Sequence, residues 1–470
     1  MIPALPPIPI HPGGALPPRR GPLPVAAARP AVAAARPLGW DPVLVCTVIY
    51  ILTAVARVHQ LVKPLALVKP VIVFSSLGLL LLLVDKNKSR VSKLLNDPTS
   101  KAALFIVLWA SIAWPFGLYR SNSVIYLWDE VWRVGILFLL TAGAVRNLHD
   151  VRRLMYVFGG GIVYLALSSM ARSHGHMRLG SDAGYDPNDL GMILVAAIPI
   201  GIYALTRARG TRYKVFAIVS LITLALSAVE TDSRGAFLAL LAVVGYTLFF
   251  LEGVSKSWRL GATVAVLGLL LYAATGAYWE RMRTILAPDD DYNRTSLTGR
   301  IEIWKRGVGY MATHPIFGVG VDNFPSAEGR SDIIATRQEE GLGTKWSVAH
   351  SSWVQIGAEM GVPGLVALIV FYFGGIGRLK RLSRMARAPD ASRELREGAA
   401  IGAALIGVMV GLAMAGSFVT QAFGYAVWAA AGLVAGLLKV MKLQGYDTGR
   451  PSPVRGAIRA RSPRAAGVAR

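Results

Sequence analysis

Stretches of about twenty apolar residues recur along this chain, and they constrain its fold more than any other feature. A helix of that length crosses the ~30 Å hydrocarbon core of a bilayer. The composition agrees, because 54% of the 470 residues are hydrophobic and only 16% are charged, which fits no ordinary soluble class. The sequence therefore predicts an all-α polytopic membrane protein with about 12 transmembrane helices.

The apolar stretches also set the expected organisation of the chain. The predicted spans are residues 42–60, 64–84, 101–118, 130–147, 152–170, 188–206, 213–230, 234–251, 258–278, 360–377, 398–416 and 421–440. The expected regions are a Pro-, Ala- and Arg-rich disordered cytoplasmic tail (1–40), transmembrane helices 1–9 (41–278), a long polar loop (279–349), transmembrane helices 10–12 (350–440) and a basic cytoplasmic tail (441–470).

The net charge of +23 follows the expected topology. Lys and Arg recur in connectors expected on one side, such as 85–101, 207–214 and 378–397, whereas Trp279–Ala349 balances nine Lys and Arg against ten Asp and Glu. This positive-inside pattern predicts that both termini are cytoplasmic and that the long loop lies outside, although the basic connector after the first span is an exception. Membrane lipids, and not nucleic acid, are therefore the expected partners.

Residues that usually hold cofactors or metals are scarce. Cys46 is the single cysteine and lies in an apolar stretch, which excludes a disulfide framework and a cysteine metal site. His174 and His176 match known metal-ligand spacings poorly. The chain has no Walker sequence and no nucleotide-binding glycine loop. We therefore expect neither a cofactor nor a metal.

The loop over 279–349 is far longer than the roughly 2–8 residues of an ordinary connection, and such loops usually have a function. Apolar residues recur in it at helical spacing, at Ile301, Trp304, Val308 and Met311. They predict an amphipathic helix with Thr298 as N-cap, ended by His314 and Pro315. Arg300 would lie in the first turn, where a cation opposes the helix dipole, so its placement favours an anionic ligand. The alternative is a helix that only lies on the membrane surface.

A second candidate is Arg234, in a short turn between two spans on the same side as the loop. There the positive-inside rule gives an arginine no role in topology. An arginine at a helix N-terminus adds its donors to free backbone N–H groups, which suits a diphosphate, and Gly235 lets a ligand approach closely. The alternative is an ion pair with Asp232 or Glu230.

His350 is the third candidate, because it stands where the long loop re-enters the membrane, ahead of a helix break expected over 359–364. A lone histidine is more often a satisfied polar group than a catalyst. Two arginines nearby would lower its pKa and keep the imidazole neutral. A neutral imidazole suits a general base that takes a proton from a hydroxyl.

The motifs of this region occur in a distinctive order. They are Asp186-Pro187-Asn188-Asp189-Leu190, Asp232-Ser233-Arg234-Gly235, Thr298-Gly299-Arg300, Trp304, His314-Pro315-Ile316-Phe317-Gly318-Val319-Gly320, Asn323-Phe324, His350-Ser351-Ser352-Trp353 and Glu359-Met360-Gly361-Val362-Pro363-Gly364. Over roughly 186–364 the chain thereby resembles the O-antigen ligase and polymerase family of bacterial envelope proteins.

The resemblance implies a metal-independent glycosyltransferase with a GT-C-like helical fold in the bacterial inner membrane. Its donor would be a glycan on undecaprenyl diphosphate, and its active site would be periplasmic. By resemblance, Arg234 and Arg300 hold the diphosphate and His350 activates the acceptor hydroxyl. Many members have Asn where this chain has Ser351. Further candidate contacts to substrate are Arg120, Asn188, Trp304, Lys305 and Ser351.

Several functions fit this reading of the sequence. The leading one is ligation of a preassembled glycan to lipid A-core, a glycolipid or another hydroxyl, as in lipopolysaccharide assembly. A polysaccharide polymerase and a protein O-oligosaccharyltransferase are alternatives on the same scaffold. A twelve-span transporter or flippase is a more distant alternative and would place ionisable residues deep inside spans. The best candidates for such residues are Asp129, Glu130 and Arg133, near a span end.

Overall fold

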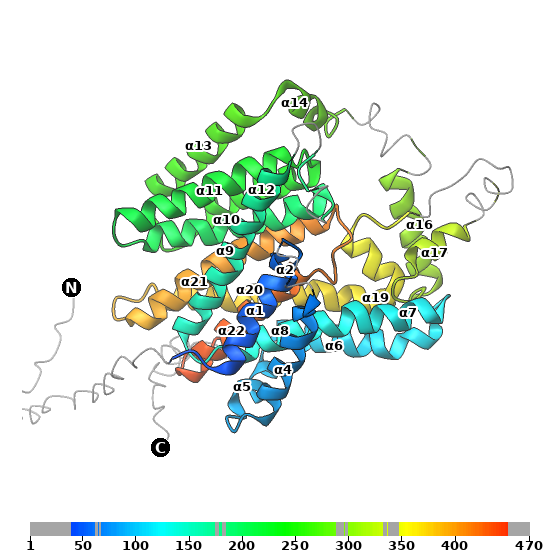
Figure 1. The fold of residues 1–470 in the computed structure, drawn as a ribbon, viewed down its shortest axis with the longest axis horizontal. Coiled ribbons are helices and arrows are strands. Elements are labelled where there is room, and N and C mark those ends of the chain that lie inside the picture. Colours follow the sequence, from blue (N-terminus) through cyan, green and yellow to red (C-terminus); the bar gives the residue numbers. More distant parts are fainter. Residues whose placement is uncertain are drawn as a thin grey trace, which may run out of the picture. The chain divides into compact units, whose positions relative to one another are not determined.

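The computed structural model describes residues 39–61, 64, 67–173, 178–180, 185–287, 296, 299–331, 336 and 347–449. Every regular element within these ranges is helical (Figure 1). Apart from Gly39, the described residues belong to one compact unit, Trp40–Arg470. The predicted all-α class is therefore confirmed for the part of the chain that the structure describes.

The elements follow one another as a succession of helices joined mostly by short connectors. In chain order they are α1 (Pro42–Ala54), α2 (Val58–Leu61), α4 (Pro70–Val84), α5 (Ser89–Ser92), η1 (Leu94–Asn96), α6 (Pro98–Ala113), η2 (Trp114–Phe116), α7 (Arg120–Tyr126), the π-helix η3 (Leu127–Val131), α8 (Trp132–Ala144), α9 (Leu148–Arg172), α10 (Pro187–Arg207), α11 (Thr211–Glu230), α12 (Arg234–Phe250), α13 (Lys256–Ala273), α14 (Gly276–Arg283), α16 (Arg300–Thr313), α17 (Phe324–Gly329), α19 (Ser352–Phe373), α20 (Ile376–Met385), α21 (Arg393–Gly416) and α22 (Tyr425–Leu443).

Within the described ranges, seven helical segments are long and apolar enough to cross a membrane. They are 98–116, 148–172, 187–207, 211–230, 352–385, 393–416 and 425–443. Two bent pairs, α4 with the short helices after it (105°) and α13 with α14 (109°), would raise the number to nine. The polytopic class is therefore confirmed, whereas twelve spans and the GT-C-like arrangement stay predictions. Two apolar helices are shorter than predicted, since α1 has 13 residues and α12 has 17.

Local sequence signals explain where many helices begin. The N-cap side chain accepts a backbone N–H at Asp41, Asp97, Asn147, Asp186, Ser233, Ser255, Thr275, Ser351 and Ser392. Proline follows the cap of α1, α4, α6 and α10, where its missing N–H leaves no hydrogen bond unmade. These caps define the residues at which the helices begin.

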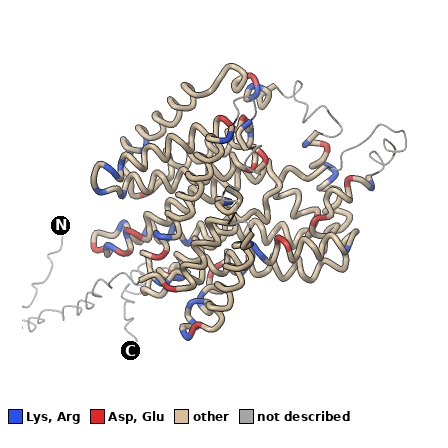
Figure 2. Tube along the Cα trace, in the orientation of Figure 1, with Lys and Arg blue, Asp and Glu red and all other residues tan. Residues whose placement is uncertain are grey.

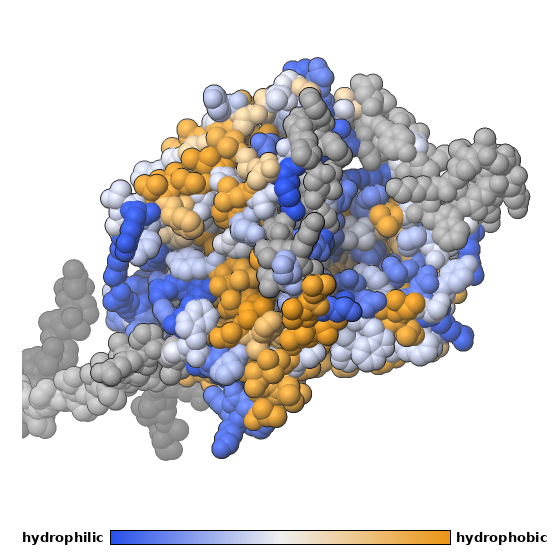
Figure 3. All heavy atoms as spheres, in the orientation of Figure 1, coloured by the Kyte–Doolittle hydropathy of each residue, from blue (hydrophilic) through white to orange (hydrophobic). Residues whose placement is uncertain are grey.

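Some helices are mostly buried in the core, and others expose apolar side chains. Most of α10, α21 and α22 is buried, and α22 packs on α8 while α10 packs on α11 and α21. By contrast, apolar side chains are exposed along α4, for example Leu80 and Leu83, and along α13, for example Leu271 (Figure 3). Such surfaces suit contact with lipid tails.

Charged residues gather at the ends of helices (Figure 2). Lys and Arg cluster at the turn from α10 to α11 and before α21, in connectors that the sequence assigns to the cytoplasm. Which side of the membrane each end faces stays a prediction.

The long loop contains the predicted helix, α16, which ends at His314 as expected. The predicted start is wrong by one position, because the N-cap is Gly299 and makes no side-chain cap; Thr298 lies outside the described residues. The predicted apolar face is also partly wrong, since Ile301 and Val308 are exposed. Ile303 and Gly307 are buried instead, because α16 packs against α19 and α17 and not only against a membrane surface.

Candidate active site

The membrane span that follows His350 is broken at the place predicted. Gly361 of α19 has φ 69° and ψ −171°, which interrupts the helix. The carbonyls of Ala358 and Glu359 accept the N–H groups of Val319 (2.8 Å) and Gly320 (3.1 Å). The long loop is therefore hydrogen-bonded into a gap in a membrane helix, and the backbone groups freed by the break are satisfied there.

Two glycines make this docking sterically feasible. A Cβ on Gly318 would lie 2.3 Å from the carbonyl carbon of Glu359, and a Cβ on Gly361 would lie 2.4 Å from the carbonyl oxygen of Ile316. Both have positive φ (68° and 69°), a conformation that other residues rarely adopt. The two glycine-containing motifs, which are distant in sequence, are thus the two halves of one contact.

Asn323 fastens the same loop to the connector between α6 and α7. Its buried amide accepts the N–H of Tyr119 (3.1 Å) and donates to the hydroxyl of Ser123 (2.8 Å). Next to it, the N–H of Phe324 donates to a buried carboxylate oxygen of Glu359 (3.1 Å). These motif residues thus hold the middle of the loop in place.

His350 stands one residue before the cap of α19. Ser351 is the N-cap, and its hydroxyl accepts the N–H of Val354 (3.4 Å). His350 is half-buried and has φ 48°, which few non-glycine residues adopt. The indole N–H of Trp304 donates to the carbonyl of Ala349 (2.9 Å), so α16 fixes the backbone just before the histidine. Such strain at a half-buried histidine is a feature found at functional sites.

Arg234 is the first residue of α12, as predicted, and follows the cap residue Ser233. One guanidinium nitrogen donates to the hydroxyl of Thr284, just after α14 (2.7 Å). The predicted alternative partner Asp232, which has φ 55°, accepts from Arg281 of α14 (2.7 Å). The turn between α11 and α12 is therefore held against α14 by two arginine contacts.

Arg178 also contacts this turn, and the sequence analysis did not identify it as a site residue. Its guanidinium donates to the carbonyls of Thr231 (3.0 Å) and Asp232 (3.3 Å). Desolvation lowers its pKa, and the positive charges of Arg281 and Arg234 lower it further. Arg178 therefore lies near two other arginines, and the carboxylates of Asp186 and Asp232 offset part of this positive charge. One signal could have identified Arg178 and Arg281, namely that a cation on the predicted outer side has no role in topology.

Asn188 positions this arginine group. Its side-chain oxygen accepts from Ser233 (2.9 Å) and from Arg178 (3.3 Å), and its side-chain nitrogen donates to Asp186 (2.7 Å). It therefore orients the turn before α12 and has a positioning role.

The connector 417–424, between α21 and α22, links the three predicted site elements. Phe418 contacts the position of Gly235, where a Cβ would lie 3.0 Å from the Phe418 Cβ, and its ring lies 6.4 Å from that of Trp304. Gln421 donates to Asp189 of α10 (2.8 Å), and its N–H donates to Ser352 of α19 (3.1 Å). The start of α12, α16 and the start of α19 thus meet at one connector, which the sequence did not single out.

The other predicted residues have simpler surroundings. Arg300 is half-buried at the first position of α16. Lys305 is exposed and pairs with Glu302 (2.6 Å). Arg120 is exposed at the first position of α7. The contacts above bring the elements of Arg234, Arg300 and His350 together.

The described residues contain no group of three or more His, Cys, Asp or Glu placed to hold a metal ion. His174 and His176 lie outside the described residues. The guanidinium, hydroxyl and imidazole groups at this site suit a phosphate-containing anion.

Comparisons with known proteins show which family this region resembles. Residues 219–369 match the family model described as O-antigen ligase, which confirms the family resemblance. The match includes Arg234, Arg300 and His350. An uncharacterised protein of Haemophilus influenzae is 23% identical over 173 residues, which cover 34% of this chain and 43% of that protein. The chain thus matches less than half the length of this relative.

Proposed function

We propose, from the O-antigen ligase family to which residues 219–369 belong, that this protein is a membrane glycosyltransferase. It would move a glycan from undecaprenyl diphosphate to an acceptor hydroxyl at the periplasmic face of a bacterial inner membrane. The observation that carries the proposal is the group of Arg178, Arg234 and Arg281, linked through the connector 417–424 to the helix start beside His350.

In the proposed reaction His350 acts as the general base. The neutral imidazole takes the proton of the acceptor hydroxyl, and the hydroxyl oxygen attacks the anomeric carbon of the glycan. The bond from that carbon to the diphosphate oxygen breaks, and its electron pair leaves with the lipid diphosphate. The hydrogen bond from Trp304 to Ala349 and the cap at Ser351 hold the backbone on both sides of the histidine.

Arg234 and Arg300 would bind the diphosphate and stabilise the charge that grows on it as the bond breaks. Each is the first residue of a helix, where the helix dipole favours a bound anion. Arg178 and Arg281 support this site, since both contact the backbone of Asp232 two residues before Arg234. These guanidinium groups would supply part of the neutralisation that a divalent metal supplies in other enzymes, which is why we propose a metal-independent mechanism.

The packing of the loop supports a second requirement, which is protection of the donor from water. Phe324 of α17, Ile303 of α16 and Ala358 of α19 form one buried cluster. A loop held this firmly can position the acceptor and limit hydrolysis of the donor.

The buried charged residues support a transporter less well than a glycosyltransferase. Lys439 of α22 is buried and donates to the carbonyls of Arg90 (3.2 Å) and Gly143 (3.1 Å). Glu359 of α19 accepts from Phe324 and from Gln355. Both side chains bind neighbouring helices and loops, which supports a role in packing.

The test is glycan transfer by the purified full-length protein in nanodiscs with an undecaprenyl-diphosphate-linked donor. Lipid A-core, a second lipid-linked glycan and a protein acceptor are supplied separately, and product size distinguishes ligation, polymerisation and protein glycosylation. We expect transfer to at least one acceptor that persists in chelator. Transfer that stops in chelator and returns with a divalent metal contradicts the metal-independent mechanism. Donor translocation without transfer contradicts the enzymatic function.

A further inference from the structure

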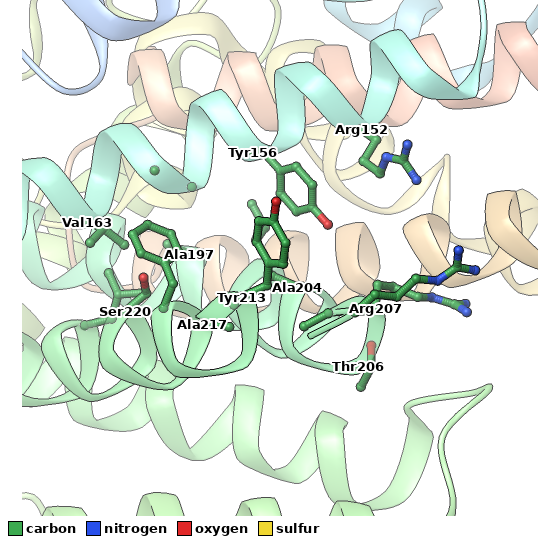
Figure 4. Close-up of a pocket in the computed structure, with 18 of the residues that line it drawn as sticks. Arg152, Tyr156, Val163, Ala197, Ala204, Thr206, Arg207, Tyr213, Ala217 and Ser220 are labelled. Carbon is green, nitrogen blue, oxygen red and sulfur yellow. The ribbon is translucent and has the colours of Figure 1, made fainter. Parts of the chain in front are cut away.

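A cavity of about 970 Å³ lies between α9, α10, α11 and the start of α21 (Figure 4). It is separate from the candidate active site, because its lining includes Arg207 at the last position of α10, whereas Asn188 of the arginine group stands at the second position of that helix. The 21 residues of α10 span about 30 Å, the thickness of a hydrocarbon core.

One end of the cavity is strongly basic. Among the residues that the structure describes, its lining includes a single glutamate, Glu397, and five arginines, which are Arg152, Arg207, Arg209, Arg393 and Arg396. Glu397 lies 3.7 Å from Arg152 and 3.6 Å from Arg207, so one carboxylate is shared between two guanidinium groups. The side chains of these two arginines remain 39% and 42% exposed. The basic end therefore has an uncompensated positive charge that faces an open space.

The rest of the cavity is mostly apolar. Figure 4 shows Arg152 and Arg207 at one end and Val163 and Ala197 at the other, with Tyr156 and Tyr213 between them. Along α9 the lining runs from Arg152 to Val163, eleven positions or about 16 Å at 1.5 Å per residue. Half of a ~30 Å hydrocarbon core is about 15 Å. The cavity therefore has the depth of one leaflet, with its charged end at the level of the headgroups.

Gly160 keeps the middle of this cavity open. It lines the cavity, and a Cβ built on it would have no heavy atom within 4 Å. The adjacent Gly159 serves packing instead, since its Cβ would lie 2.9 Å from a side-chain atom of Ile200 on α10. One glycine thus allows α9 and α10 to pack closely, and the next leaves room for an occupant.

We propose that this cavity is a binding site for an anionic phospholipid, whose phosphate headgroup contacts the arginines and whose acyl chain lies along α9 and α11. A soluble anion would leave the apolar part of the cavity unfilled, and a neutral lipid would leave the arginines without a counter-charge. Basic pockets between transmembrane helices are known to bind anionic headgroups. This site does not depend on the proposed glycosyl transfer.

The test uses the full-length protein in nanodiscs of phosphatidylcholine that contain a small fraction of phosphatidylglycerol with a photoreactive acyl chain. We expect crosslinks on α9 and α11, and we expect native mass spectrometry to show phosphatidylglycerol retained in preference to phosphatidylcholine. The Gly160→Leu variant should lose roughly ten-fold in retention, because its side chain fills the apolar part of the cavity. The control is Gly245→Leu on α12, where a Cβ also meets nothing within 4 Å.

The headgroup contact is tested by Arg209→Gln combined with Arg393→Gln, which leaves the contacts of Glu397 in place. This double variant should lose on the order of ten-fold in phosphatidylglycerol retention. Its control is Lys380→Gln combined with Arg384→Gln, which removes two positive charges from exposed positions of α20. Equal losses in both double variants would show that only net charge matters and would overturn the site.

Three further outcomes would also overturn the proposal. Equal retention of phosphatidylcholine and phosphatidylglycerol would remove the role of the arginines. Crosslinks spread evenly over lipid-facing helices such as α13 would show ordinary annular lipid. Displacement of the lipid by millimolar inorganic phosphate alone would identify a soluble anion as the ligand.

Discussion

The two ends of α10 each lie beside a group of arginines, and the two groups are held in different ways. At the N-terminal end, Arg178 and Arg281 donate to backbone carbonyls of the α11–α12 turn, and Arg234 donates to Thr284. At the C-terminal end, Arg152 and Arg207 share Glu397 at 3.7 and 3.6 Å, beside a cavity of about 970 Å³.

This difference suggests different ligands. Guanidinium groups fixed by short hydrogen bonds keep one geometry, which is needed where charge develops during a reaction. Exposed guanidinium groups around a hollow can adapt to a mobile headgroup and are not suited to chemistry. The number of arginines alone would favour the C-terminal end as the reaction site, since more arginines lie there. The fixed hydrogen bonds at the N-terminal end are the reason why we propose that end as the site of the reaction.

The largest effect should follow from His350→Ala. Loss of a general base should lower glycan transfer by roughly 10²- to 10⁴-fold. Phosphatidylglycerol retention at the other end of α10 should stay at the wild-type level. Transfer is measured with the lipid-linked donor in nanodiscs, and His149→Ala, at the second position of α9, is the control for loss of an imidazole. Retained turnover in His350→Ala would remove the histidine from the role of base.

Replacing Arg234 or Arg300 with lysine should have the next largest effect. Lysine keeps the charge but loses the planar fork that binds two phosphate oxygens at once, so transfer should fall by roughly ten- to a hundred-fold. Arg283→Lys is the matched control, because Arg283 is exposed on α14 two positions after Arg281. Wild-type rates in both lysine variants would mean that the N-terminal arginines are structural, and the contrast between the two ends would disappear.

The sequence predicted those parts of the site that depend on local signals. His314 and Pro315 end α16 as expected, and the glycine- and proline-containing break in the last long motif is present at Gly361. Arg234 begins α12 because Ser233 provides a cap directly before it. Caps, prolines and glycines act over a few residues, so one sequence is enough to identify them.

Features that depend on distant partners could not be predicted in this way. The buried face of α16 is set by α19, which is why Ile303 is buried while Val308 is exposed. Phe418 and Gln421 gain their importance from contacts with residues more than a hundred positions away, Trp304 and Asp189. No periodicity or motif in the connector 417–424 predicts these contacts.

Gly361→Ala tests whether docking of the long loop on α19 is needed for transfer at the N-terminal end of α10. The new Cβ would lie 2.4 Å from the carbonyl oxygen of Ile316, at a φ of 69°, so we expect a destabilisation of about 1–3 kcal/mol. Thermal unfolding in detergent should show a lower midpoint, and transfer should fall because the loop no longer docks. Gly309→Ala in α16, where a Cβ meets nothing within 4 Å, is the control and should be neutral or slightly stabilising. An unchanged midpoint in Gly361→Ala would show that the break in α19 tolerates a side chain.

The smallest effect should come from Glu397→Gln at the C-terminal end. This change removes the one negative charge in the described lining of the cavity, and it leaves Arg152 and Arg207 with more charge to offer a phosphate. Phosphatidylglycerol retention should rise by roughly two- to five-fold, since ion pairs between partly exposed groups are worth less than about 1 kcal/mol. Native mass spectrometry at two salt concentrations measures the gain, which should shrink at high salt because screening weakens the headgroup contact. A fall in retention would mean that Glu397 orients the arginines and does not compete with the lipid for them, so the C-terminal group would then be as fixed as the N-terminal one.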